Sequence, residues 1–294
     1  MSDCRGGAEF GEGGGKFGGT QVNSWLWSPG ATGQSPNGDE TFAVSASLAD
    51  ECCTSSGHGY SRPMTHVRPP VSALRDDPHY LACVADLLGV LAYGELVAFE
   101  RLAADAAMAP TFSDKTELAY RATLEFSSFL RLRDRLSELG LDADTVMEPF
   151  REPLDSYHSH TAPGDWLEGL MKVYVGDGIS SDFYREIAHY VDSETSSLVL
   201  EVCDARNGDF VVERIRSAIE QDPRVAGRLA LWGRRLVGEA LTQAQRVAAD
   251  RDGISTLLVG GVDRPGADLA ELGRMFARLT DDHTKRMQAL GLAA

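Results

Sequence analysis

The amino-acid sequence predicts an all-α protein whose folded part begins near residue 77. Apolar residues recur from there almost to the C-terminus at intervals of three and four, which is the spacing of one face of a helix. Proline, glycine and asparagine interrupt this pattern where helices would end. No segment shows the sustained apolar–polar alternation of a half-buried strand.

The N-terminal quarter of the chain has a different composition. Thirteen of the thirty glycines precede residue 60, and no period of 2 or 3.6 residues is sustained there. Such a segment buries too little apolar surface to offset the entropy of ordering it. We therefore expect residues 1–76 to be a disordered, low-complexity extension and residues 77–294 to be the helical domain. A mis-assigned start codon would give the same composition.

The first two predicted helices are long and lie next to each other in the sequence. The first runs from residue 78 to 108, where Ala109 and Pro110 stop it. The second begins at Ser113, which is suited to cap a helix, and ends near Gly140. A proline-marked loop follows, containing Pro149, Pro153 and Pro163. Its length suits the crossover connection of a ferritin-like four-helix bundle.

The remaining helices complete that bundle and extend it. The third and fourth are predicted at 164–190 and 193–206, and additional C-terminal helices at 210–220, 223–250 and 267–290. The Gly176-Asp177-Gly178 sequence is unfavourable inside the third helix, because each glycine costs about 1 kcal/mol relative to alanine. The fold class is thus all-α, a ferritin-like four-helix bundle with additional C-terminal helices.

Composition limits the compartment and the partners. The five cysteines are odd in number, and two of them lie within apolar helical patterns, so we expect free thiols and a cytoplasmic location. No run of eighteen apolar residues is present, so we expect no membrane span. The formal charge of −16 disfavours non-specific nucleic-acid binding. A homodimer through the Leu229, Trp232 and Leu236 stripe is one use of the C-terminal helices, and capping the bundle is the other.

One acidic residue interrupts the apolar stripe of each of the first four helices. These residues are Glu95, Glu125, Asp177 and Asp204. A lone buried carboxylate is costly, so it usually acquires a partner cation, a raised pKa or a metal ion. Each pair of helices turns back about midway between its two carboxylates, which would place them at the same depth. Four inward carboxylates form the frame of a di-iron or di-manganese site.

Several segments resemble one family of proteins. They are LGVLAYGE (88–95), WLEGLMKVYVGDG (166–178), DFYREIA (182–188) and RLALWGRRLVGEALTQAQ (228–245). In these the chain resembles the actinobacterial ferritin-like proteins related to the tRNA 2-methylthio-isopentenyladenosine hydroxylase (MiaE-like). The resemblance covers about residues 80–250. It implies a di-iron bundle with Glu-x-x-His pairs on the second and fourth helices.

The sequence departs from that pattern at both histidine positions. Ser128 follows Glu125, and Asn207 follows Asp204, at the spacing where the family has histidine. Both residues are altered ligand positions, which would leave an all-oxygen site suited to manganese, magnesium or calcium. Second-choice carboxylate ligands are Glu201 and Glu168. His189 lies about three turns from Asp177, so we do not expect it to reach the metal site. We expect His158 and His160, in the crossover loop, to be exposed to solvent.

Three functions follow from these features. The first is an O2-dependent di-iron hydroxylase, for which the resemblance implies a modified tRNA base as one substrate class, although the charge disfavours tRNA. The second is a metal-free, catalytically inactive scaffold or protein-binding module that has lost its histidine ligands. The third, iron storage, ranks last because the chain carries extra C-terminal helices. No catalytic residue is assigned from the sequence.

Overall fold

Helices account for nearly all of the ordered elements in this computed structural model, which describes residues 68–204, 208–261 and 264–294. The N-terminal half contains α1 (Ala73–Asp76), α2 (Pro78–Asp105), η1 (Ala106–Met108), α3 (Phe112–Glu138) and α4 (Ala143–His160). The middle contains α5 (Trp166–Lys172), η2 (Val173–Asp177), α6 (Gly178–Ile187), α7 (Ser193–Asp204) and α8 (Asp209–Gln221). The C-terminal part contains α9 (Arg224–Asp250), α10 (Gly253–Val259), β1 (Gly260–Gly261), β2 (Arg264–Pro265) and α11 (Leu269–Ala289).

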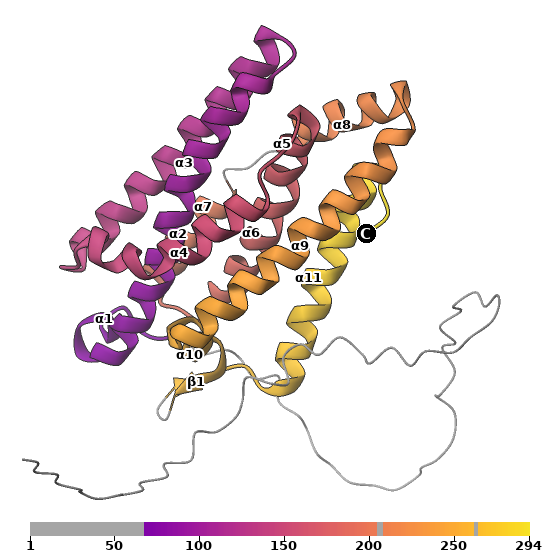
Figure 1. Cartoon of the computed structure of the whole chain (residues 1–294). Coiled ribbons are helices and arrows are strands. Elements are labelled where there is room, and N and C mark those ends of the chain that lie inside the picture. The colour runs from indigo at the N-terminus through magenta and orange to yellow at the C-terminus, as the bar shows by residue number, and fades with distance from the viewer. Residues whose placement is uncertain (1–67, 205–207, 262–263) are drawn as a thin grey trace, which may run out of the picture. The chain divides into compact units, whose positions relative to one another are not determined.

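The fold is all-α, as the sequence predicts. In the described part of the chain, β structure is confined to the antiparallel pairing of β1 with β2, two residues each. Figure 1 shows α2 and α3 side by side along their lengths, and α9 and α11 on the far side of the α5–α6 run. Helix α2 packs against α3, α4 and α10, α9 packs against α4, α5 and η2, and α6 packs against α7 and α11. The additional helices α8 to α11 follow α7 in the chain.

Helix α2 is the central helix of the bundle. It begins where the Asp77 carboxyl accepts hydrogen bonds from the N–H groups of His79 and Tyr80, with Pro78 in its first turn. Judged by length and composition alone, the helical segment 78–108 could cross a membrane, because it contains an 18-residue window with a mean hydropathy of 1.8. However, 61% of that window is buried inside the protein, so most of its apolar surface packs against other helices. A cytoplasmic location stays a prediction.

Helix α3 packs against α2 as an antiparallel partner. Thr111, and not the predicted Ser113, caps its N-terminus by accepting a hydrogen bond from the Asp114 N–H at 3.1 Å. Asp114 itself is buried and accepts a hydrogen bond from Nε of Arg214 on α8 at 2.6 Å. Although burial opposes ionisation, the bonds from Arg214 and Thr111 hold the pKa of Asp114 below its usual range. This pair therefore joins α8 to the bundle.

The proline-marked segment was wrongly predicted to be a loop. It forms α4, which Asp142 caps by accepting from the Thr145 N–H at 3.0 Å. Pro149 and Pro153 lie inside this helix and each removes a backbone donor. Phe150 is fully buried against α2, and Met147 and Pro153 are buried on the same face. Burial of this apolar face outweighs the local cost of the prolines.

The last nine residues of the predicted extension, 68–76, are described in the structure. Residues 1–67 of the predicted extension lie outside the described residues. The next nine residues include α1, and Leu74 of that helix is 5% exposed and belongs to the core. The helical domain thus includes residues that the sequence pattern assigned to the extension, because a single buried leucine in a four-residue helix produces no detectable period.

The C-terminal helices cover the bundle. Leu229, Trp232 and Leu236 of α9 are buried in one core cluster with Leu170 of α5 and Met287 of α11. Of the two uses considered for this stripe, capping the bundle is therefore the one that the fold shows. A homodimer stays a prediction that nothing within the chain tests. Helix α10, which packs against α2, was not predicted.

Candidate functional site

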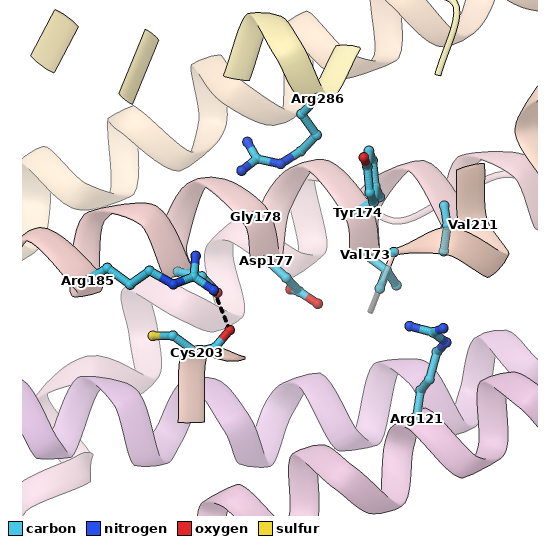
Figure 2. A pocket seen from close by; sticks show the side chains of 11 residues that line it. Arg121, Val173, Tyr174, Asp177, Gly178, Arg185, Cys203, Val211 and Arg286 are labelled. Carbon is cyan, nitrogen blue, oxygen red and sulfur yellow. Dashed lines mark hydrogen bonds between the residues drawn. The ribbon is translucent and has the colours of Figure 1, made fainter. Parts of the chain in front are cut away.

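A cavity of about 140 Å³ lies where the η2–α6 segment meets four other helices. Figure 2 shows its lining side chains converging from α3, the η2–α6 segment, the end of α7, the start of α8 and α11. The lining residues are Arg121, Val173, Tyr174, Asp177, Gly178, Ser181, Arg185, Cys203, Gly208, Val211 and Arg286. Three arginines and one aspartate thus line the cavity.

The η2 segment is a single π-helical turn, a wider turn that contains one extra residue. Gly176 within η2 and Gly178 at the start of α6, both unfavourable in a plain helix, allow other side chains to approach closely. A Cβ on Gly178 would lie 2.2 Å from Nε of Arg286, and one on Gly176 would lie 2.7 Å from the Tyr157 hydroxyl. A Cβ on Gly208, at the start of α8, would lie 2.3 Å from the Tyr174 ring. Gly178 and Gly208 line the cavity, and a larger residue at either position would meet another of its lining side chains.

Arg185 ties the α6 side of the cavity to the end of α7. Its Nη2 donates to the backbone oxygen of Cys203 at 2.7 Å and to Oδ1 of Asp204 at 3.2 Å (Figure 2 shows the first of these). Its Nη1 donates to Oδ1 of Asp182 at 3.1 Å. The guanidinium is therefore already engaged with two carboxylates and a carbonyl.

Arg286 of α11 crosses the cavity over Gly178. Its Nη2 donates to Oδ2 of Asp182, while Nη1 is buried and has no hydrogen-bond partner among the described residues. Burial raises the pKa of the nearby Tyr174 hydroxyl and Arg286 opposes that rise, so this hydroxyl stays protonated and able to donate. Burial, with the help of Arg286, lowers the pKa of His283, one turn earlier on α11, so its ring is neutral near pH 7.

The other side of the cavity carries both signs of charge. In Figure 2 the Arg121 guanidinium of α3 and the Asp177 carboxylate of η2 point into the space between their helices. The Arg121 side chain is 15% exposed, and its Nε donates to Oε1 of Glu117 at 3.0 Å. Of the four predicted metal ligands, only Asp177 lines this cavity.

The two carboxylates predicted on the first two helices do face inward. Glu95 is 3% exposed on α2 and Glu125 is 6% exposed on α3, both within the apolar stripes predicted for them. Ser128, one turn beyond Glu125, is also buried, at 5% exposed. None of these three residues lines the cavity. The structure thus confirms their burial, while metal ligation by them stays a prediction.

The expectation that Asp204 faces the core is wrong. Its side chain is 71% exposed and pairs with Arg185, because α7 buries a different face, made by Thr195, Val199, Val202 and Cys203. Asn207 lies outside the described residues. The second-choice ligands are also engaged elsewhere: Glu201 pairs with Arg131 at the surface, and Glu168 accepts from Nη1 of Arg228 at 2.6 Å.

The third predicted helix contains the π turn η2, and the buried residues after this turn do not follow one straight stripe. Ser180 is exposed and Ser181 is buried, whereas Ile187, seven residues after Ser180, is fully buried. A straight 3.6-residue period across residues 164–190 does not include the wider turn.

The described residues do not fit a di-iron site. In the ranges 68–204, 208–261 and 264–294, no group of three or more histidine, cysteine, aspartate and glutamate side chains is arranged to hold a metal ion. One of the four predicted carboxylates is exposed, and guanidinium groups stand around another. No chemical step is therefore assigned to an iron pair.

Comparison with known protein families agrees with the bundle. A family model described as a ferritin-like domain of actinomycetes matches residues 78–261, more than half of the chain. The chain belongs to this family. The match ends before α11, so Arg286 and His283 lie on a helix beyond it. No curated protein matches the sequence. The closer relation to the tRNA hydroxylase stays a prediction.

The ferritin-like domain contains a second buried polar cluster, between the ends of α2 and α4 and α5. Nζ of Lys172 donates to the backbone oxygen of Thr161 at 2.9 Å and lies 5.4 Å from the Tyr157 ring centroid. Burial lowers the pKa of Lys172 to about 8, and Asp105 opposes that shift. Burial, together with Lys172 and Arg101, lowers the pKa of His158 to about 3.

This cluster corrects the expectation for the two histidines. Both lie on α4, not in a loop, and only His160 is exposed. His160 pairs through Nδ1 with Oε1 of Glu239 on α9 at 2.8 Å. His158 is held neutral within the fold, and its Nδ1 is buried with no hydrogen-bond partner in the described part of the chain.

The His158→Gln variant is expected to resist acid better than the unmodified protein. An unfolded histidine takes up a proton below pH 6.5, whereas folded His158 does so only near pH 3, so protonation favours unfolding between these values. This histidine should cost about 1 to 2 kcal/mol at pH 5 relative to pH 7. Urea unfolding of both proteins at pH 5 and 7 measures this cost. A histidine control is His160→Gln, and equal acid sensitivity of all three proteins would contradict the pKa shift.

Sequence reasoning missed the three arginines of the cavity. Arg121 precedes Glu125 by four residues, so it lies on the same side of α3, which is a signal available from spacing. Arg185 and Arg286 gave no such signal. Their positions depend on the π turn and on the packing of α11 over Gly178, and neither follows from a helical period.

Proposed function

We propose that this ferritin-like domain acts as a metal-free, ligand-binding scaffold and not as a di-iron oxygenase. The observation that carries the proposal is the engagement of Asp204. Its side chain is 71% exposed and ion-paired with Arg185, so it points away from the core where the predicted frame needs it. Three guanidinium groups line the cavity beside Asp177, the remaining ligand of that half of the frame.

The charges around the cavity also support the proposal that the domain is metal-free. A divalent cation needs several oxygen or nitrogen ligands free to point at it. Arg185 and Arg286 both bind Asp182, which leaves this carboxylate committed to cations already inside the protein. Like charges at short range repel strongly where water is excluded, so the guanidinium groups oppose the binding of metal cations in the cavity.

Two features favour the alternative, an O2-dependent di-iron hydroxylase. Glu95 and Glu125 are buried on neighbouring helices, and the chain belongs to a ferritin-like family. An iron or manganese site built on these two residues would be rich in oxygen ligands and lack both family histidines. The formal charge of −16, however, disfavours tRNA as the substrate of such a hydroxylase.

Thermal unfolding of the full chain with added Fe²⁺, with added Mn²⁺ and with EDTA tests the proposal. A ligand that binds only the folded state raises the melting temperature, by an amount equivalent to about 2.7 kcal/mol at one hundred times Kd. We expect equal melting temperatures in all three conditions. An increase with iron that Glu125→Gln removes and the surface control Glu201→Gln retains would overturn the proposal in favour of the hydroxylase.

A further inference from the structure

The N-terminal half of α3 carries large apolar side chains on its outer face. Phe112 is 89% exposed and Tyr120 is 58% exposed, which leaves both aromatic rings in contact with water. Thr116 lies midway between them, and residues four apart on a helix are neighbours on one side of it. The three residues therefore form a single outward stripe, and contiguous apolar surface of this kind marks a contact with another molecule.

A shallow hollow of about 570 Å³ lies beside this stripe, between α3 and the start of α8. Its lining includes Phe112 and Tyr120 from α3, and Phe210 and Arg214 from α8. The α8 side is held in place, because Nε of Arg214 donates to buried Asp114 at 2.6 Å and its guanidinium lies 5.3 Å from the Phe210 ring centroid. A cavity of about 150 Å³ holds a six-membered ring, so the hollow has room for one aromatic side chain.

The protruding ring and the hollow lie next to each other on one surface, which suits an identical copy of the chain. In a two-fold dimer, a residue that contacts a second residue of the partner is matched by the reverse contact. Thr116 is four residues from both Phe112 and Tyr120. Two α3 helices that cross antiparallel at Thr116 therefore place Phe112 of each copy opposite Tyr120 of the other, beside the hollow. One contact covers both protruding rings and leaves no unpaired half.

The charges at this surface are balanced. Residues 112–121 of α3 and 210–214 of α8 contain three basic and three acidic side chains, which are Lys115, Arg121, Arg214, Asp114, Glu117 and Glu213. Five of these six are paired within the chain: Arg121 with Glu117, and Arg214 with Asp114 and with Glu213. The chain as a whole carries a formal charge of −16. Two copies thus meet with least repulsion at a locally neutral surface such as this one.

We propose that this surface, formed by Phe112, Thr116, Tyr120, Phe210 and Arg214 and called here the Phe112 face, binds a second copy of the chain in a two-fold dimer. The Phe112 ring of each copy occupies the hollow of the other, as aromatic anchors do at the centre of protein interfaces. The exposed parts of the two α3 rings amount to roughly 300 Å² per copy, against about 800 Å² per partner in a standard interface. The dimer is therefore weak, and it goes beyond the proposed function because no metal or ligand takes part in it.

Sedimentation equilibrium of the full chain over a range of concentrations tests the dimer. We expect a monomer–dimer equilibrium with a Kd of about 10 μM that becomes tighter in added salt, because salt screens the repulsion between two acidic chains. Phe112→Ser should weaken the dimer at least about tenfold, and the fold is expected to tolerate it because the side chain is 89% exposed. Leu269→Ser on α11 is the matched control, since it removes an apolar side chain that is 84% exposed, and it should leave the Kd unchanged.

A charge exchange at Thr116 tests the two-fold arrangement itself. Residue 116 lies opposite its own counterpart, so Thr116→Lys and Thr116→Glu should each be monomeric through like-charge repulsion, whereas their equimolar mixture should dimerise. A monomer at every concentration, a dimer that Phe112→Ser leaves unchanged, or one that Leu269→Ser weakens equally would overturn the inference. A mixture of the two Thr116 variants that stays monomeric would also overturn it.

Discussion

Replacing Gly89 with alanine is expected to destabilise the bundle by about 2 kcal/mol, which would lower the melting temperature by about 4 to 8 °C. A Cβ at this position of α2 would lie 2.7 Å from both Cγ1 and the backbone oxygen of Val146, and 3.1 Å from Phe150. A backbone atom cannot rotate away, so α4 must move. The gain in helix propensity, about 1 kcal/mol, offsets only part of this cost.

Gly94→Ala on the same helix is the matched control. A Cβ there would meet only Leu154, at the ordinary contact distance of 3.7 Å. This variant should be as stable as the unmodified protein or more stable, by up to about 1 kcal/mol, because alanine favours the helix. Thermal unfolding by circular dichroism compares the three proteins. Equal stability of Gly89→Ala and Gly94→Ala would contradict the close packing of α4 on α2.

Replacing Asp192 with alanine is expected to cost about 3 kcal/mol. Asp192 is fully buried just before α7, and its Oδ1 accepts from the N–H groups of Glu194 and Thr195 at 3.1 and 3.0 Å. Its Oδ2 accepts from the Thr195 hydroxyl at 2.7 Å and from the Tyr80 hydroxyl of α2 at 3.0 Å. The variant loses the cap of α7 and removes the acceptor of several buried donors at once.

Asp142→Ala is the corresponding surface control. Asp142 caps α4 through the Thr145 N–H but is exposed to solvent, so water can replace the lost acceptor. This variant should cost only about 1 kcal/mol. Urea unfolding measures both, and a double-mutant cycle with Tyr80→Phe isolates the bond between α2 and the start of α7. Equal costs for Asp192→Ala and Asp142→Ala would show that the buried network adds nothing.

Helical period predicted the two long helices well because their cores are regular. Along α2 and α3 the buried residues follow the predicted stripes, and Glu95 and Glu125 occur within them. These helices lie in unbroken antiparallel contact, so one face of each stays buried along its length. The spacing of apolar residues along these two helices was therefore enough to predict that both carboxylates are buried.

The helical period of the sequence did not predict which side chains are buried where the backbone departs from a regular helix. Beyond the π turn at η2, Ser181 is buried and Ser180 is exposed, although Ile187 is fully buried. On α7 the predicted stripe contained Asp204, whereas the structure buries the neighbouring stripe of Val199, Val202 and Cys203. A helix this short carries two apolar stripes, and its period alone does not decide which of them is buried.

Segments with proline or with long-range contacts were the hardest to predict. Pro149 and Pro153 indicated a loop, whereas burial of Phe150 stabilises a helix there. The cavity depends on Arg286, whose place over Gly178 joins residues 108 positions apart in the sequence. No local pattern reports such a contact.

The measurement that tests the central claim most directly is the metal content of the purified full chain, expressed with supplementary iron and analysed for iron and manganese. The account predicts much less than one equivalent of either metal, because Asp204 is committed to Arg185 and guanidinium groups line the cavity at Asp177. Close to two equivalents of iron, lost in Glu95→Gln and Glu125→Gln, would contradict it and support the di-iron hydroxylase.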